Sequence, residues 1–596
     1  MNRCCTSSCW ILIAALWLLG CSPSAETPPP EKAAQAARSP VSPAAVEQAR
    51  REVAARQAVG AVPPPPPPAS PVPAAAGSGA PLVADAKMAT NLAASQPVGQ
   101  QADALQTLRA ASEPTDREQY AHQDDNPVKR AAEQPVSTFS IDVDTGSYAN
   151  VRRFLNQGRL PPHDAVRVEE LINYFDYDYP LPDSRQPPFR VSTELAPTPW
   201  NPQTLLLAIG IKGYELPKTQ LPPANLVFLI DVSGSMESSD KLELLKPALK
   251  LLTRQLRAED KVAIVVYAGA AGMVLEPTPG SQKAKIEAAL DRLSAGGSAN
   301  GGAGIQLAYR LARDGFVKGG VNRVILATDG DFNVGAVDFE GLKNLVETQR
   351  KSGVALTTLG FGAGNYNDRL MEQLADAGNG NYAYIDTLQE ANKVLVEQMS
   401  ATLLTIAKDV KIQVEFNPAV VAEYRLIGYE NRVLQREDFN NDAVDAGDIG
   451  AGHTVTALYE IALKGSGALS DPLRYGQPKA EDTPHGDEIA FLRLRYKQPD
   501  SDSSRLLEWP IRRDQAAKDW QATSERFRFA AAVAGFGQLL RGGRYTGRFG
   551  YDEVMALARS ARGADPYGYR GEFLTLVGLA RSLDPGQEGE SGQAIR

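Results

Sequence analysis

Short apolar runs alternate with amphipathic segments between residues 225 and 404, and this alternation constrains the fold more than any other feature. The runs have the length of buried strands, and the segments between them repeat apolar residues at helical spacing. Strands that alternate with helices of this length predict a doubly wound, mostly parallel α/β sheet. The predicted strands are 226–230, 262–267, 324–327 and 355–361, and the predicted helices are 242–256, 286–293, 305–311 and 342–349.

The first predicted strand ends in three oxygen-bearing side chains at alternate positions, Asp231, Ser233 and Ser235. A further carboxylate, Asp329, follows the predicted strand at 324–327. In a doubly wound sheet, ligands bind beyond the carboxyl ends of the strands, so we expect these side chains to share one point. Oxygen ligands suit a divalent cation, with Mg²⁺ favoured and Mn²⁺ or Ca²⁺ as alternatives. The competing interpretation is a polar loop that only caps strands and helices.

The segments on both sides of this region have a β pattern instead. Residues 191–195 and 205–211 indicate strands before it, and residues 410–416, 455–461 and 492–496 alternate apolar and polar side chains after it. Such alternation is typical of half-buried antiparallel strands. We therefore expect the α/β domain to be inserted into a sandwich built from both flanks.

The chain divides into five predicted segments. The end of the chain is helical, with apolar residues on one face between 529 and 540. The predicted segments are a signal peptide (1–20), a disordered tether (21–135), an N-terminal α+β domain (136–224), the α/β domain (225–405) and a β-rich, then helical, C-terminal domain (406–596).

The N-terminal residues form a predicted export signal. Arg3 supplies a positive charge, and residues 10–19 are an apolar segment too short to span a bilayer. Residues 18–21, Leu-Leu-Gly-Cys, resemble a bacterial lipobox, which implies cleavage before Cys21 and a lipid on its thiol. All four cysteines lie within the first 21 residues, so no disulfide is expected in the mature chain. The alternative is an ordinary signal peptide with a coincidental cysteine.

The residues after Cys21 predict a long tether. Residues 22–134 are rich in Pro, Ala and Gln and include six consecutive prolines at 63–68. This composition cannot bury a core, and a chain of about 110 such residues has a root-mean-square reach of about 55–60 Å. Ser22 stands where an inner-membrane retention signal would place Asp, so the lipobox resemblance favours the outer membrane of the cell envelope.

Charge and histidine content argue against two classes of function. The net charge is −9 and no long Lys/Arg cluster occurs, which argues against nucleic-acid binding. The four histidines are scattered, and none lies between 225 and 404. The sequence has no His-Glu-x-x-His motif, nucleophile elbow or nucleotide-binding phosphate loop. Ser233 has no evident base, so its hydroxyl is better explained as a metal ligand than as a nucleophile, and no enzyme activity is expected.

Other acidic motifs have simpler explanations than a metal site. Residues 142–147, Asp-x-Asp-x-Gly-Ser, are similar to the start of a calcium loop but lack the later bidentate Glu. A turn that opens a helix is the preferred interpretation there. We expect Glu169 and Glu170 on a solvated helix face, residues 440–448 in a solvated loop, and Asp331 in a turn.

Taken together, these features resemble a von Willebrand factor type A domain. The motif at 231–235 matches its metal-ion-dependent adhesion site, and Asp329 in Thr-Asp-Gly matches the later Asp of that site. More narrowly, residues 139–180, the α/β domain and the region from 401 onward resemble the bacterial YfbK-like group. The resemblance implies a six-stranded sheet with helices on both faces. It also implies ion-dependent protein binding, in which a carboxylate of the partner completes the coordination shell.

One position departs from the family pattern. The family places a Thr hydroxyl in the Gly-Gly loop, and this sequence has Ala299 there. Either a water fills the gap or the Ser298 hydroxyl reaches in. In both cases the site loses a preorganised ligand, so metal affinity is expected to fall. In the family that Thr also marks the ligand-competent state, so the departure affects switching as well.

The sequence supports two main functional hypotheses. The first is a non-enzymatic, lipid-anchored binding module of the cell envelope that holds an acidic side chain of a protein partner through a divalent cation. The second is a structural or regulatory envelope scaffold with a degenerate metal site and metal-independent contacts. A hydrolase with an unrecognised active site is a third hypothesis. Some relatives of the domain serve cytoplasmic AAA ATPases, and the export signal argues against such a partner.

Overall fold

The computed structural model describes residues 118–141, 144–297, 301–330, 339–466, 469 and 485–584. The chain divides into two compact units, 1–97 and 98–596, and every described residue belongs to the second. The predicted signal peptide, the predicted lipidation site Cys21 and most of the predicted tether lie outside the described residues. Within the described ranges, no helix has the length and apolar character needed to cross a membrane.

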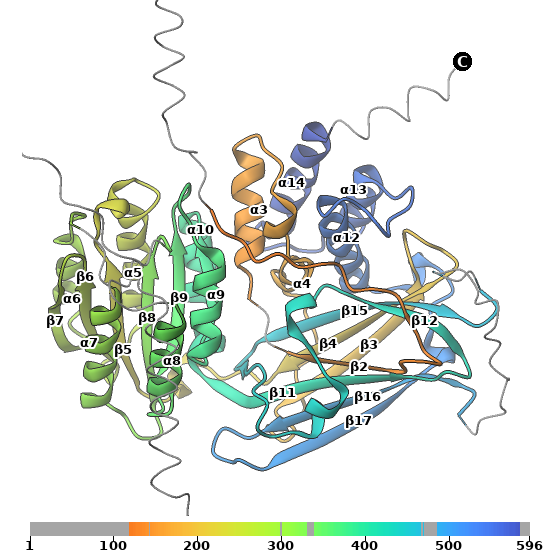
Figure 1. The fold of residues 1–596 in the computed structure, drawn as a ribbon, viewed down its shortest axis with the longest axis horizontal. Coiled ribbons are helices and arrows are strands. Elements are labelled where there is room, and N and C mark those ends of the chain that lie inside the picture. Colours follow the sequence, from red (N-terminus) through yellow and green to blue (C-terminus); the bar gives the residue numbers. More distant parts are fainter. Residues whose placement is uncertain are drawn as a thin grey trace, which may run out of the picture. The chain divides into compact units, whose positions relative to one another are not determined.

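Six strands form the sheet of the α/β domain (Figure 1). They are β5 (Ala224–Asp231), β6 (Lys261–Tyr267), β7 (Ala271–Pro279), β8 (Val321–Thr328), β9 (Ala355–Phe361) and β10 (Tyr382–Ile385). Their order is β10-β9-β8-β5-β6-β7, and all neighbours are parallel except β6 and β7. The predicted doubly wound, mostly parallel sheet is therefore confirmed, and the structure adds β7 and β10 to the four predicted strands.

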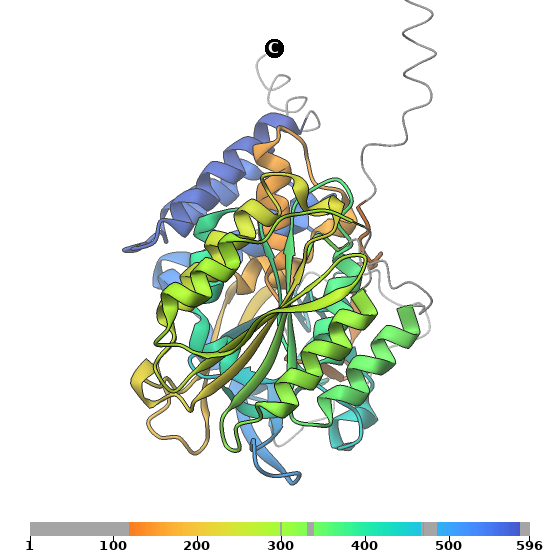
Figure 2. The ribbon, with the colours of Figure 1, turned by 90° about the vertical axis from the view of Figure 1, so that its left-hand side faces the viewer.

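Helices lie on both sides of this sheet (Figure 2). They are α5 (Leu242–Gln255), α6 (Lys283–Asp291), α7 (Gly301–Asp314), α8 (Phe339–Arg350), α9 (Asp368–Ala377) and α10 (Leu388–Asn392). Along β5, Phe228 packs into the core shared with α5 and α6, and the next residue, Leu229, packs into the core shared with α7 and α9. Because both faces are covered, every residue of β5 is buried, which explains the continuous apolar run at 226–230.

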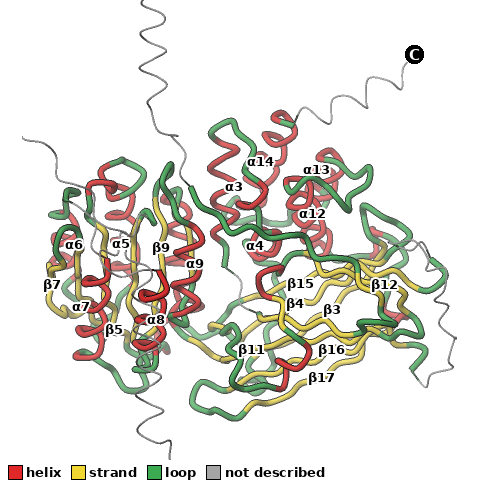
Figure 3. Tube along the Cα trace, in the orientation of Figure 1, coloured by secondary structure: helices red, strands yellow, loops and turns green. Residues whose placement is uncertain are grey.

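Two antiparallel sheets combine strands from before and after the α/β domain (Figure 3). The earlier strands are β1 (Lys129–Arg130), β2 (Val136–Ser140), β3 (Phe189–Pro197) and β4 (Leu205–Gly213). The later strands are β11 (Thr405–Phe416), β12 (Val421–Ile427), β13 (Val433–Leu434), β14 (Ile449–Gly450), β15 (Thr454–Leu463), β16 (Glu488–Lys497) and β17 (Ser504–Arg512). One sheet has the order β1-β12-β15-β4-β3 and the other β13-β2-β11-β16-β17, with β14 paired to β11.

The two sheets share one apolar core. Leu207 of β4 and Ile412 of β11 belong to it, and the rings of Phe416 and Tyr424 stack across the sheets with centroids 4.0 Å apart. The prediction that the α/β domain is inserted into a sandwich built from both flanks is therefore confirmed.

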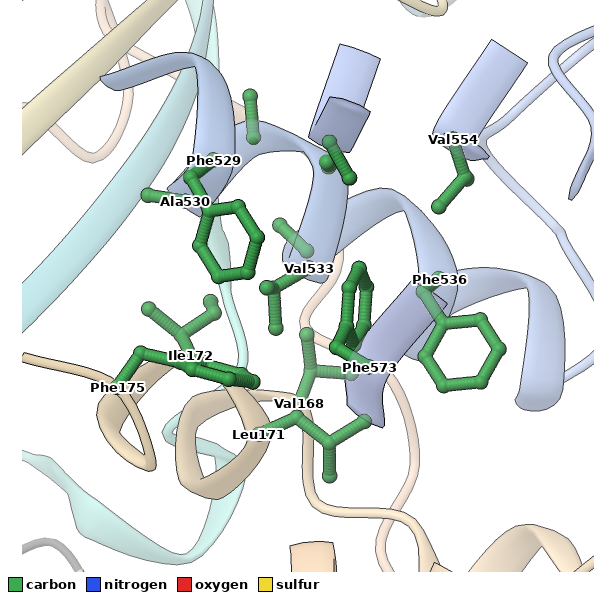
Figure 4. Packing of buried hydrophobic residues seen from close by; sticks show 14 of the residues in the cluster. Val168, Leu171, Ile172, Phe175, Phe529, Ala530, Val533, Phe536, Val554 and Phe573 are labelled. Carbon is green, nitrogen blue, oxygen red and sulfur yellow. The ribbon is translucent and has the colours of Figure 1, made fainter. Parts of the chain in front are cut away.

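A second group of helices lies outside the six-stranded sheet. It consists of α3 (Gly146–Asn156), α4 (Val168–Asn173), α12 (Glu525–Leu540), α13 (Tyr551–Arg559) and α14 (Tyr569–Leu583). Their apolar side chains meet in one core (Figure 4). The Phe529 ring meets the rings of Phe175 and Phe573 edge-on, with centroids 4.9 and 5.5 Å away. The predicted apolar face at 529–540 is thus buried, and so are most of the other residues of α12.

The described structure extends further toward the N-terminus than the predicted end of the tether. The predicted tether extends to residue 135, yet the structure describes the chain from Glu118 onward. Glu118 Oε1 accepts a hydrogen bond from Gly364 N at 2.8 Å, and its Oε2 accepts one from Arg153 at 2.7 Å. Polar side chains hold this segment, and an apolar pattern cannot reveal such contacts.

Glu169 and Glu170 are buried, so the prediction of a solvated face is wrong. Each residue is 2% exposed. Helix α4 lies against α3, α12 and β15, which leaves little of its surface to solvent. Glu170 accepts a hydrogen bond from Ser147 N at 2.8 Å and pairs with Arg167. A six-residue helix is too short for its sequence pattern to show that several of its faces are covered.

The remaining acidic motifs have structural roles. Asp144 precedes α3, where its Oδ1 accepts a hydrogen bond from Tyr382 N at 2.8 Å, and Asp142 lies outside the described residues. In the 440–448 loop, residues up to 443 are exposed as predicted. At its end, burial raises the pKa of Asp448 to about 7.

Candidate functional site

The candidate site lies at the ends of two neighbouring parallel strands. Strands β5 and β8 pair with Ile230 opposite Ala327, and the sequence order of the strands reverses between them. Asp231 is the last residue of β5, and Asp329 directly follows β8. The fold therefore brings both carboxylates to one edge of the sheet, at the point where doubly wound folds bind ligands.

Asp231 is fully buried and is held by uncharged donors. Its Oδ1 accepts a hydrogen bond from Ser233 N at 2.9 Å, and its Oδ2 accepts bonds from Tyr267 OH at 3.0 Å and Thr328 Oγ1 at 2.8 Å. Burial raises the pKa of the Asp231 carboxyl, the bonds from Ser233 and Thr328 lower it, and the charge of Asp329 raises it further. Within the described residues, Asp231 forms no ion pair.

The two serine hydroxyls lie next to each other. Ser233 Oγ and Ser235 Oγ are 3.0 Å apart. Ser233 precedes the short 3-10 helix Gly234–Glu237, which contains Ser235 and turns the chain away from the end of β5. Two neighbouring hydroxyl oxygens beside a carboxylate are ligands that a hard divalent cation accepts.

The loop that carries Ala299 approaches the serines. Gly234 N donates a hydrogen bond to Gly297 O at 2.9 Å, which holds the start of this loop beside the 3-10 helix. Ser298 and Ala299 follow directly and lie outside the described residues, as does Asp331. The roles that the sequence suggests for these three residues stay predictions.

Two further side chains surround Asp329, and sequence reasoning missed both. Lys241 Nζ donates to Asp329 Oδ2 at 2.9 Å, and Asn365 Nδ2 donates to the same oxygen at 3.2 Å. Asn365 follows β9, the neighbour of β8, so attention to every strand end could have found it. Lys241 directly precedes α5, and no sequence signal shows that its side chain reaches the ends of the strands.

The donor set fits a hard divalent cation. Asp231 and Asp329 supply carboxylate oxygens, and Ser233 and Ser235 supply hydroxyl oxygens, which are the ligand types that Mg²⁺, Mn²⁺ and Ca²⁺ take. Two carboxylates and the ammonium of Lys241 leave one net negative charge. The described residues contain no group of three or more His, Cys, Asp or Glu that could hold a metal, so an ion here would need the hydroxyls.

Three family comparisons cover most of the described chain. Residues 225–398 match the family described as von Willebrand factor type A domain, and residues 401–583 match the family described as Uncharacterized protein YfbK, C-terminal. Residues 114–208 match a family described as von Willebrand factor. Domains of the von Willebrand factor A type commonly mediate protein–protein interactions, and they often bind a divalent cation at a metal-ion-dependent adhesion site.

The chain is also similar to individual proteins. Uncharacterized protein YfbK of Escherichia coli (strain K12) is 52% identical over 468 residues, which cover 77% of this chain and 80% of the relative. Uncharacterized protein sll0103 of Synechocystis is 26% identical over 323 residues, which cover 53% of this chain and 71% of the relative. Among solved structures, the von Willebrand factor type A protein from Catenulispora acidiphila aligns with a TM-score of 0.37 and 17% identity, covering 66% of this chain and 91% of that chain. The chain belongs to the YfbK family of proteins that contain a von Willebrand factor type A domain.

Proposed function

We propose that this protein is a non-enzymatic, lipid-anchored module of the bacterial cell envelope that binds a protein partner through a divalent cation. The observation that carries the proposal is the meeting of Asp231 and Asp329 at the ends of β5 and β8, beside the Ser233 and Ser235 hydroxyls. Von Willebrand factor type A domains are protein-interaction modules, which supports the proposal that this protein binds a protein partner.

The four site residues have distinct roles in this proposal. Ser233 and Ser235 present their hydroxyl oxygens to the ion, and Asp231 and Asp329 supply the negative charge that attracts it. When bound, the ion supplies a positive charge that attracts an acidic side chain of the partner. Mg²⁺ is the first candidate, with Mn²⁺ and Ca²⁺ as alternatives.

The absence of enzyme activity is part of the proposal. No histidine occurs between residues 225 and 405 of the sequence. The Ser233 hydroxyl bonds the Ser235 hydroxyl, which is not a base that can activate it. These features favour a role as ligands over a role in nucleophilic catalysis.

Calorimetry and thermal denaturation with Mg²⁺, Mn²⁺ and Ca²⁺ test the metal site. A cation present at 100 times its dissociation constant stabilises the folded protein by about 2.7 kcal/mol. We expect this stabilisation in the wild type and its loss in Asp231→Ala. Ser235→Ala, which removes only one hydroxyl, should weaken binding without unfolding the domain. Asp291→Ala, an exposed carboxylate on α6, is the matched control. A wild type that responds to none of the cations would contradict the proposal.

Ala299→Thr tests the interpretation of the Gly-Gly loop. Restoring the family's hydroxyl should tighten metal binding in the same titration, because it returns a preorganised oxygen ligand. An unchanged affinity would mean that position 299 does not face the ion.

The partner and the location need separate measurements. Cross-linking in envelope fractions, with and without a chelator, should capture a protein partner only when the cation is present. Capture must also be lost in Asp231→Ala. Cys21→Ala should move the protein from membrane fractions to soluble fractions, and a variant that stays membrane-bound would contradict the lipid anchor.

A scaffold with metal-independent contacts is the second candidate. The specific observation in its favour is the ion pair between Lys241 and Asp329, 2.9 Å long, which neutralises one of the two carboxylates without a metal. This candidate predicts that cross-linking is insensitive to a chelator and to Asp231→Ala.

A further inference from the structure

Lys241 places an ammonium group inside the candidate site. Its Nζ donates to Asp329 Oδ2 at 2.9 Å, to Ser235 O at 3.0 Å and to Asn365 Oδ1 at 2.8 Å. An ammonium has three donors, and these oxygens accept all three. The Lys241 side chain is only 8% exposed, so water screens its charge poorly.

The surrounding loop fixes the position of this ammonium. The stem of Lys241 crosses Gly362, and a Cβ at that glycine would collide with Cγ and Cε of the lysine. Gly362 also has a φ of +78°, which glycine adopts without strain. The Tyr384 hydroxyl donates to Gly362 O at 2.7 Å, and Glu118 accepts from Gly364 N at 2.8 Å. Lys241 is therefore a fixed component of the site and not a mobile surface lysine.

The three acceptors of Lys241 come from three different strand ends. Ser235 lies in the loop after β5, Asp329 follows β8, and Asn365 follows β9. One positive group thus joins the loops after β5 and β8, which the proposed cation would also join, to the loop after β9. Two of its acceptor residues, Ser235 and Asp329, are also proposed metal ligands.

We propose that Lys241 is a built-in counter-ion that competes with the divalent cation for Asp329. Without a divalent cation, the ammonium neutralises the buried Asp329 carboxylate and keeps the loops together. A divalent cation that uses this carboxylate must either displace the ammonium or bind next to it against charge repulsion. The wild-type site therefore keeps its shape without metal and binds divalent cations weakly. The inference rests on the proposed function, since it concerns the same cation.

Titration calorimetry on the full chain tests the competition. Lys241→Met keeps the stem and removes the charge, so Mg²⁺ and Mn²⁺ should bind it about tenfold more tightly than wild type, or better. Lys250→Met is the matched control, because Lys250 lies in α5, which Lys241 directly precedes, but pairs with Asp291 instead. It should bind with wild-type affinity. Equal affinities of Lys241→Met and wild type would overturn the inference.

Thermal denaturation gives a second readout that does not depend on binding heat. In a chelator, Lys241→Met should melt at a lower temperature than wild type, because Asp329 has lost its cation. Added Mg²⁺ should raise the melting temperature of the variant more than that of wild type. Lys241→Gln, whose amide can still donate to Asp329, repeats the test should the Met variant fold poorly. In the double variant Lys241→Met/Asp329→Asn, stability without metal should return and the gained affinity should disappear.

The outcomes separate this inference from the proposed function. Metal binding by wild type with unchanged affinity in both neutral variants keeps the proposed function and overturns the inference. Binding by the neutral variants but not by wild type supports the inference and overturns metal-dependent function of the natural chain. Binding by none of them overturns both.

Discussion

Two regions of the molecule bury carboxylates, and they differ in what opposes the negative charge. The first region joins the α/β domain to helices α3 and α4. There, Arg152 contacts Asp386 and Glu390, and Arg167 contacts Asp368 at 2.6 Å. Each of these carboxylates is met by a guanidinium, whose rigid set of donors suits buried ion pairs.

The second region is the strand-end site, where only one of the two carboxylates is paired with a positive group. Asp329 meets the single ammonium of Lys241, while Asp231 is held by hydroxyl and amide donors and forms no ion pair with any described residue. These ion pairs of the first region are therefore complete without a ligand and act as a structural joint. The second leaves one negative charge that the described chain does not neutralise, and such a charge is a reason to expect a ligand.

Arg152 gives the most direct test of the first region. Removing one partner of a buried ion pair leaves uncompensated charge, which costs about 3–5 kcal/mol. Arg152→Met should therefore lower the free energy of unfolding by that amount, because it leaves Asp386 and Glu390 without their guanidinium partner. Urea titration measures the loss. Arg159→Met, at an exposed position just after α3, should change stability by less than about 0.5 kcal/mol. A small effect at Arg152 would mean that the first region is not the structural joint described above.

A negative charge added to the second region tests whether this region can hold a cation. Asn365→Asp replaces the amide that donates to Asp329 with a carboxylate, so without metal it should cost about 1–2 kcal/mol. The same change adds an oxygen ligand with a negative charge, so Mg²⁺ should recover the loss and bind more tightly. Thermal denaturation with chelator and with Mg²⁺ checks both parts. Asn344→Asp, on the exposed side of α8, should show no recovery by Mg²⁺. Failure of Mg²⁺ to stabilise Asn365→Asp would contradict the view that this region is built for a cation.

The sequence could predict the features that follow from local pattern and strand topology, but not contacts between distant side chains. Apolar period and strand ends predicted the doubly wound sheet and the meeting of Asp231 with Asp329, because both follow from local pattern and topology. Strand β10 was missed because it has four residues, which is too few for a pattern. Lys241 was missed because its contact with Asp329 spans 88 positions and depends on where α5 begins.

The difference between the two regions matters only if a buried carboxylate without an ion pair lowers stability. Glu169 tests this. It belongs to α4 in the first region, but its Oε2 has no hydrogen-bond partner among the described residues. Burial raises its pKa to about 7, and the charge of Glu430 adds to the effect. Because this pKa lies above the ordinary value of 4.5, the folded chain holds the proton more tightly than the unfolded chain. The contribution of Glu169 to stability is therefore highest below about pH 4.5, falls as the pH rises toward 7, and is constant above that.

Glu169→Gln cannot ionise and nearly keeps the shape of the side chain. At pH 8 it should be more stable than wild type by about 1 kcal/mol, and at pH 5 the difference should largely disappear. Urea titrations at the two pH values measure this. Glu437→Gln makes the same chemical change at an exposed position and should show no such dependence on pH. If Glu169→Gln is less stable than wild type at pH 8, its ionised carboxylate is compensated after all. A buried carboxylate without an ion pair, such as Asp231, would then no longer indicate that the strand-end site binds a cation.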